Sequence, residues 1–168
     1  MRIAAISDVH GNLPALEAVL ADIRARGCDA LVNLGDVASG PLWPAETVDL
    51  LMTVPALTIR GNHERQLLAD PERMRESDRV AREALSSGHL AWIAGLPAQA
   101  RFAGAALLVH GSPRSDIDYL LERVEPDGPR PATAAEVAPA LDGHDAGLVL
   151  CGHTLVPRAL RLADGRLC

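Results

Sequence analysis

The apolar residues of this chain follow two periods, one typical of strands and one typical of helices. Short continuous apolar runs predict strands over residues 3–6, 30–34, 56–59, 105–109 and 147–151. Between these runs, apolar residues recur three or four positions apart, as they do over residues 16–23, and this spacing predicts helices. Strands that alternate with helices usually form a largely parallel sheet, so the pattern indicates an α/β fold.

Start and stop signals set the limits of the predicted helices. They cover residues 14–26, a segment from about 44, residues 64 to about 86, residues 88–96 and residues 133–141. Thr133 and Glu136 have the spacing of a capping box, in which each side chain binds the other residue's free N–H. Residues 111–131 contain four prolines and are expected to form a long surface loop. Residues 159–168 are expected to form a hairpin that turns at Asp164-Gly165.

The composition is that of one folded domain over residues 1–168. A chain of 168 residues buries roughly 70% of its unfolded surface, and 48% apolar with 23% charged residues is typical of a globular protein. The net charge of −6 and the aromatic content of 2% argue against a long nucleic acid as partner. No apolar run is long enough for a signal peptide or a membrane span, and three scattered cysteines favour a reducing compartment. We therefore expect a cytoplasmic protein without a membrane partner.

Residues that bind metals follow the end of every predicted strand. They are Asp8 and His10, Asp36, Asn62 and His63, His110, and His153. Because ligands of an open α/β sheet bind beyond the carboxyl ends of its strands, we expect these side chains to meet. Carboxylate, imidazole and amide donors suit Mn²⁺, Fe²⁺, Zn²⁺, Co²⁺ or Ni²⁺. Seven donors exceed the needs of one tetrahedral ion, so the pattern predicts a two-metal site that activates water.

Five motifs make the sequence resemble the calcineurin-like metallophosphoesterases, in their bacterial phosphodiesterase-like branch. The motifs are Asp8-x-His10, Gly35-Asp36 with Gly40-Pro41, Gly61-Asn62-His63-Glu64, His110-Gly111-Ser112-Pro113 and Gly152-His153-Thr154. They follow the family's order and extend from residue 3 to about residue 158. The resemblance implies a two-layered β core flanked by helices, with the layer order αββα.

The resemblance also implies two divalent metal ions. Mn²⁺ is the preferred metal, and Fe, Zn, Co or Ni are the alternatives. Asp36 would bridge the two ions. The remaining ligands would be Asp8 and His10 for the first ion, and Asn62, His110 and His153 for the second. A hydroxide that bridges the ions would attack a phosphomonoester, a phosphodiester or a nucleotide.

Three further side chains receive a role in this comparison. His63 stands at the position of the family's catalytic histidine, and Asp36 or Glu64 is the carboxylate expected to hold it. Arg114 and Arg158 are candidates for contacts with a substrate phosphate, because the guanidinium fork matches phosphate oxygens.

Two departures from the family's pattern leave a second function open. Relatives commonly have a second histidine after Gly-His-Thr, where this chain has Leu155, so the first ion would keep three protein ligands. Relatives also continue past the last hairpin, so the C-terminal part is expected to be shortened and to leave a sheet edge open to a second chain. The alternative to an active phosphoesterase is a degenerate domain that binds metal or phosphate as a scaffold or sensor. Hydrolysis of a non-phosphate bond is a third reading.

Overall fold

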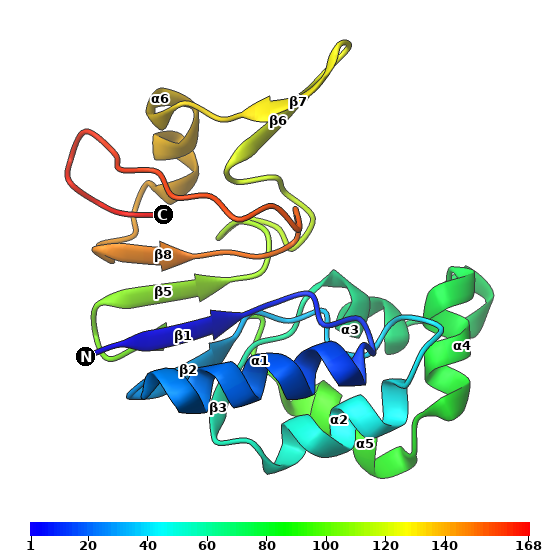
Figure 1. Ribbon diagram of the computed structural model, residues 1–168. Helices are drawn as coiled ribbons and strands as arrows, with labels where there is room; N and C mark the ends of the chain where they lie inside the picture. The colour runs from blue at the N-terminus through cyan, green and yellow to red at the C-terminus, as the bar shows by residue number, and fades with distance from the viewer.

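Two small sheets face each other in this computed structural model, which describes the backbone of residues 1–168 and every side chain except that of Arg73. The first sheet is parallel, and its strands lie in the order β1 (Ile3–Ile6), β2 (Ala30–Asn33) and β3 (Ala56–Thr58). These are the first three strands that the sequence predicts, within one residue at their ends. Their carboxyl ends therefore lie at one edge of the molecule (Figure 1).

The second sheet is mixed. Its order is β4 (Gln99–Phe102), β5 (Ala106–Val109) and β8 (Leu148–Leu150), with β4 antiparallel and β8 parallel to β5. Since β5 and β8 run in the same direction as β1, their ends meet those of the first sheet (Figure 1).

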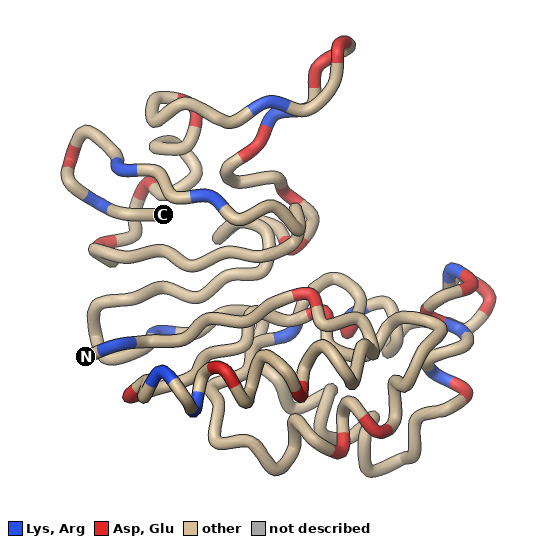
Figure 2. The backbone as a smooth tube through the Cα atoms, viewed as in Figure 1, with Lys and Arg blue, Asp and Glu red and all other residues tan. Residues whose placement is uncertain are grey.

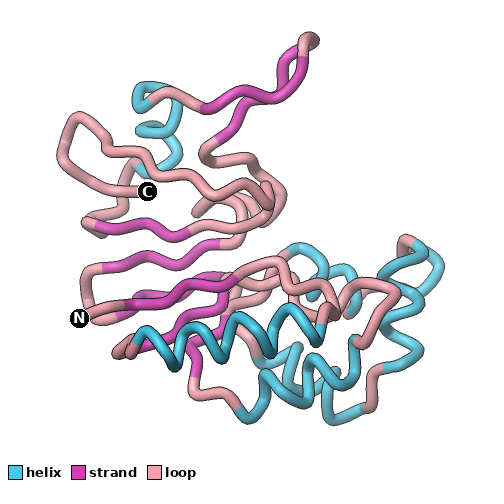
Figure 3. The backbone as a smooth tube through the Cα atoms, in the orientation of Figure 1, coloured by secondary structure: helices cyan, strands magenta, loops and turns pink.

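Helices cover the outer side of each sheet, which gives the predicted layer order αββα (Figures 1 and 3). Three helices lie against the first sheet: α1 (Leu13–Arg26), α2 (Pro44–Thr53) and α5 (Ser87–Gly95). The second sheet is covered by α6 (Ala134–Val137), which starts with the predicted Thr133 capping box, and by the short helix η2 (Ala138–Leu141). Within the described part of the chain, no helix has the length and apolar character needed to cross a membrane.

Apolar side chains fill the space between the two sheets. Val32, Leu34 and Ile59 from the first sheet pack against Ala106 and Leu108 from β5. All five are almost completely shielded from solvent. This layer fixes the distance between the two sheets and with it the distance between the loops at their carboxyl ends.

The single helix predicted over residues 64 to about 86 is wrong, because the segment is broken twice. It consists of α3 (Asn62–Leu67), a short 3₁₀ helix η1 (Pro71–Arg73) and α4 (Glu76–Ala84). Pro71 has no N–H to continue a helix, and it disfavours the helical conformation of the residue before it. The Asp70 side chain instead accepts the N–H of Glu72 at 3.1 Å and starts the new turn.

The long loop predicted over residues 111–131 is also wrong in its second half. That half forms a hairpin of β6 (Glu122–Glu125) and β7 (Gly128–Pro131), which projects from the body (Figure 1). Prolines are tolerated in a two-stranded hairpin because each strand has a free edge where no N–H is needed. The turn at Asp164-Gly165 forms as predicted, but only isolated bridges, among them Arg161 with Leu167, replace regular strands there.

The loops after β2 and β3 are held together by the buried carboxylate of Glu64. It accepts three backbone N–H groups, from Asp36 at 2.7 Å, Val37 at 2.8 Å and Gly61 at 2.8 Å. The loops are so close that a Cβ atom on Gly35 would collide with the backbone of Gly61. Burial and the nearby charge of Asp36 raise the pKa of Glu64, and the three N–H groups oppose this shift.

Replacing Glu64 tests whether this contact determines the stability of the fold. We expect Glu64→Ala to lower the free energy of unfolding by at least about 3 kcal/mol, because three buried N–H groups lose their acceptor. Glu64→Gln keeps one acceptor oxygen and should cost less. Urea denaturation measures both changes. The exposed Glu76→Gln is the control, and equal stability of Glu64→Ala and this control would contradict the assignment.

Candidate metal centre

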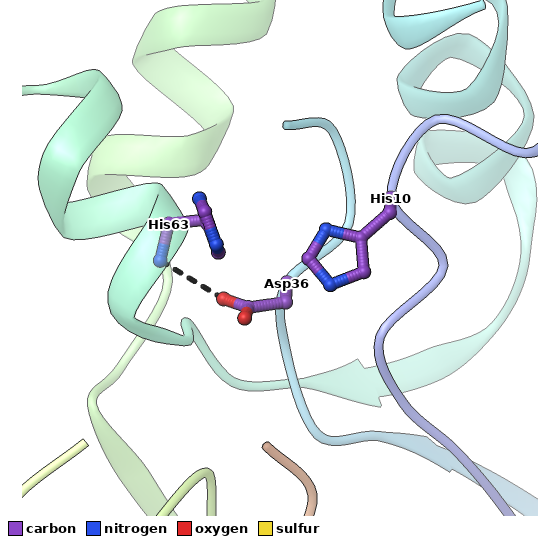
Figure 4. A group of neighbouring side chains, drawn as sticks. All are labelled: His10, Asp36 and His63. Atoms are coloured by element: carbon purple, nitrogen blue, oxygen red, sulfur yellow. Dashed lines mark hydrogen bonds between the residues drawn. The ribbon is translucent and has the colours of Figure 1, made fainter. Parts of the chain in front are cut away.

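The residues predicted to bind metal gather at the shared carboxyl edge of the two sheets. Two groups of three side chains place their ligand atoms within 4.8 Å of one another. The groups are His10, Asp36 and His63 (Figure 4), and Asp36, His110 and His153. Asp36 belongs to both groups and is only 2% exposed. The structure therefore brings together side chains that come from loops after all five predicted strands.

His110 is the most deeply buried histidine of the cluster. Its Nδ1 lies 2.7 Å from the carbonyl oxygen of Leu34, and its Nε2 lies 3.0 Å from Asp36 Oδ2 and 3.1 Å from Asn62 Oδ1. A proton on Nδ1, donated to Leu34, leaves the Nε2 lone pair free for a metal ion. Burial lowers the pKa of His110, but the hydrogen bond to Asp36, the charges of Asp36 and Asp8 and the contact with Leu34 together outweigh it and raise the pKa to about 9. In the absence of a metal ion, the position of the cation between His110 and Asp36 can thus be taken by a proton.

Asp8 and His10 form the other side of the cluster. Nδ1 of His10 donates to the carbonyl oxygen of Ser39 at 2.8 Å, and its Nε2 lies 3.8 Å from Asp8 Oδ1. Asp8 Oδ2 accepts the backbone N–H of His153 at 3.0 Å, whereas Oδ1 is buried and has no hydrogen-bond partner among the described residues. A buried carboxylate oxygen without a partner is costly. A divalent cation would satisfy it, so this donor set fits a metal.

The loops of the cluster contain most of the backbone strain of the chain. Six non-glycine residues of the described chain have positive φ angles, and five of them are in these loops. They are Asp8 (56°), His10 (50°), Asp36 (55°), His153 (71°) and Leu155 (57°). Each costs roughly 1–2 kcal/mol relative to an ordinary conformation. Strain that the surrounding structure maintains in this way is concentrated at functional sites.

His63 is held by a carboxylate that the sequence analysis did not identify. Its Nδ1 lies 2.6 Å from Oδ1 of Asp78, a fully buried residue of α4. The prediction that Asp36 or Glu64 holds the ring is wrong. From His63, Asp36 accepts the backbone N–H at 2.9 Å and nothing from the ring, and Glu64 accepts backbone N–H groups of the neighbouring loops. Asp78 and Ala81 are the buried residues of α4, but no pattern in this charged segment indicates which of its acidic side chains faces inward.

His153 is positioned by two neighbouring rings. Its ring centroid lies 5.2 Å from that of His110, and Tyr119 stacks on it with a centroid distance of 5.1 Å. Burial and the neighbouring His110 lower the pKa of His153, which favours the neutral form that metals bind. The sequence analysis did not identify Tyr119, because nothing in the segment 111–131 indicated which side chain turns toward the cluster.

The remaining predicted residues lie around the cluster. Arg158 forms an ion pair with Glu122 at 2.5 Å, and Arg114 donates to the carbonyl of Pro139. Both guanidinium groups thus have protein partners, and their contact with substrate stays a prediction. Leu155 is 67% exposed and lines a cavity of about 400 Å³ together with Asp8 and Arg158.

The chain is similar to known phosphoesterases in sequence and in fold. Residues 1–157 match the family model of calcineurin-like phosphoesterases. The crystal structure of a metallophosphoesterase from Sphaerobacter thermophilus is similar, with a TM-score of 0.78 and 34% identity over 98% of this chain and 65% of that one. This chain thus spans less than two thirds of that protein.

Two further relatives are of unassigned function. A hypothetical protein from Pyrococcus horikoshii has a TM-score of 0.77 and 18% identity over 99% of this chain and 75% of that one, which shows the fold alone. An uncharacterized protein of Methanocaldococcus jannaschii is 45% identical over 62 residues, which are 37% of this chain and 26% of that protein. The family model covers most of the sequence and the fold agrees with it, so the chain belongs to the calcineurin-like phosphoesterase family.

Proposed function

We propose that this protein is a metal-dependent hydrolase of phosphoester bonds with a binuclear centre. The observation that carries the proposal is the position of Asp36, which belongs to two groups of ligand atoms at once. A shared carboxylate is what two ions about 3.5–4 Å apart require. Membership of the phosphoesterase family supports phosphoester hydrolysis in general.

The proposed ligands divide into two sets on either side of Asp36. Mn²⁺ is the preferred metal. The first ion would be held by Asp8 and His10. The second would be held by Asn62, His110 and His153. Bound at these residues, the ions would activate water and neutralise charge on the phosphoryl group. The chain itself contributes the fixed orientation of each imidazole, through carbonyl oxygens such as those of Leu34 and Ser39.

His63 is proposed to protonate the leaving oxygen. Its Nδ1 is bound to Asp78, so Nε2 remains free for the substrate. The carboxylate of Asp78 fixes the tautomer and stabilises the protonated ring. In this arrangement His63 is the acid and Asp78 is a positioning residue.

Metal content and turnover together test these roles. We expect Mn²⁺-dependent hydrolysis of bis(p-nitrophenyl) phosphate that EDTA abolishes. His110→Ala should lose both bound Mn²⁺ and turnover, whereas His63→Ala should keep its Mn²⁺ and lose about 10²–10⁴-fold in kcat. Elemental analysis and steady-state kinetics measure these effects. His144→Ala, a histidine outside the cluster, is the control, and full activity of His63→Ala would contradict its role.

Asp78→Asn separates positioning from metal binding. We expect kcat to fall by about 10–100-fold with KM and bound Mn²⁺ nearly unchanged, because the ring of His63 loses its carboxylate partner while the ligands stay in place. Glu83→Gln on the same helix, an exposed residue, should behave as the unchanged protein. A rise in KM or a loss of Mn²⁺ in Asp78→Asn would instead show a general effect on the fold.

The scaffold or sensor function remains the second candidate, because Leu155 stands at the position where the family's motif commonly has histidine. Its exposed side chain lines the cavity that contains Asp8, so a histidine there could reach the first ion. Under the phosphoesterase proposal, the unchanged chain turns over substrate when Mn²⁺ is saturating. A scaffold would bind metal without turnover.

Leu155→His distinguishes these two functions. We expect it to raise the affinity of the first site for Mn²⁺ at least about tenfold and to reach full turnover at lower Mn²⁺. Met52→His, at an exposed position of α2 that does not line this cavity, controls for an added imidazole. Two bound ions without turnover in both the unchanged chain and Leu155→His would favour the scaffold. No bound metal in either would contradict both functions.

A further inference from the structure

An arginine-lined cavity of about 300 Å³ lies beside the candidate metal centre. Arg60, Arg65 and Arg114 line it together with His110. Nε2 of the same His110 lies 3.0 Å from Asp36 Oδ2, so one imidazole belongs both to the cavity wall and to the metal-binding cluster. A group held in this cavity would therefore lie next to the centre.

The cavity carries positive charge that the described residues do not compensate. Its one carboxylate, Asp116, accepts two hydrogen bonds from Arg65, at 2.7 Å and 2.8 Å, so this pair is neutral. Arg114 donates to an uncharged carbonyl, that of Pro139. The guanidinium of Arg60 has no hydrogen bond or ion pair with any described side chain. Two positive charges thus remain in a chain whose net charge is −6 and whose acidic and basic residues are interspersed elsewhere (Figure 2).

Both uncompensated arginines are on loops that also contain proposed ligands. Arg60 lies two residues before Asn62, and its backbone N–H donates to the carbonyl of Pro97 at 2.9 Å. Arg114 lies four residues after His110, and its backbone N–H donates to Ser112 Oγ at 3.0 Å. Their main chains are therefore held in place relative to the centre. Preorganised arginines of this kind suit a phosphate group, whose oxygens match the guanidinium fork.

We propose that this cavity is an anion subsite that holds a second phosphate group of the substrate. The inference rests on the proposed function and narrows it to phosphoesters that carry a further phosphate besides the scissile one. Inorganic phosphate presents the same oxygens, so the test must separate a substrate phosphate from a free one.

Two nucleotides that differ only by one phosphate provide the test. Thymidine 3′,5′-bisphosphate and thymidine 5′-phosphate are titrated into the Mn²⁺-loaded chain by calorimetry. We expect the bisphosphate to bind at least about tenfold more tightly, as one added charge-assisted contact implies. In Arg60→Ala the two affinities should become equal within about twofold. Arg60→Lys should keep part of the preference, since it keeps the charge and loses the fork.

Arg24→Ala is the matched control, because Arg24 is an exposed arginine of α1 that does not line the cavity. It should keep the full preference for the bisphosphate. An equal affinity for both nucleotides in the unchanged chain, or a preference that survives in Arg60→Ala, would overturn the proposal.

Inorganic phosphate titrated into the metal-free chain forms the second arm of the test. Binding that depends on Arg60, together with equal affinity for the two nucleotides, would assign the cavity to free phosphate and overturn a substrate subsite. These affinities do not depend on turnover. A lack of hydrolysis of bis(p-nitrophenyl) phosphate would therefore contradict the proposed function separately from the subsite.

Discussion

The buried carboxylate of Glu64 is the interaction on which the candidate centre depends. It joins two loops that are distant in sequence by accepting N–H groups from both, at Asp36 and Val37 on one side and Gly61 on the other. Asp36 is thereby kept in a left-handed conformation at the meeting point of both groups of ligand atoms. A side chain that belongs to neither group of ligand atoms thus decides where the carboxylate common to both groups lies. The strain of the surrounding loops, roughly 1–2 kcal/mol for each left-handed residue, is offset by contacts of this kind.

Charge is distributed in two zones around this point. Asp8, Asp36, Glu64 and Asp78 are all nearly inaccessible to solvent, and the described residues include no arginine paired with any of them. They are stabilised by backbone N–H groups and by histidines, and among the described residues Asp8 Oδ1 and Asp78 Oδ2 have no hydrogen-bond partner. Buried negative charge of this density favours cations. Arg60, Arg65 and Arg114 line a cavity together with His110, and their charge favours an anion there.

The sequence predicted the parts of the site that follow from topology. Once parallel strands are placed, the ends of β1, β2, β3, β5 and β8 must meet, and the residues after them meet as well. Contacts that depend on side-chain orientation could not be predicted in this way. Asp78 lies among many charged residues of α4, and only the packing of that helix against α3 turns it toward His63. The cavity around Arg60 combines three separate segments, which no local pattern relates to one another.

The backbone conformation at Leu155 is set by its surroundings and not by the leucine side chain. The residue keeps a left-handed φ of 57° next to His153 at 71°, although an exposed leucine gains neither burial nor a hydrogen bond from that conformation. The cost is met by neighbouring contacts, such as the N–H of His153 on Asp8 and the close approach of Gly152 to Ser7. The turn is therefore formed independently of the side chain at position 155. Because the backbone is already in place, we expect the side chain at position 155 to affect how tightly the proposed first ion is held and to have little influence on the fold.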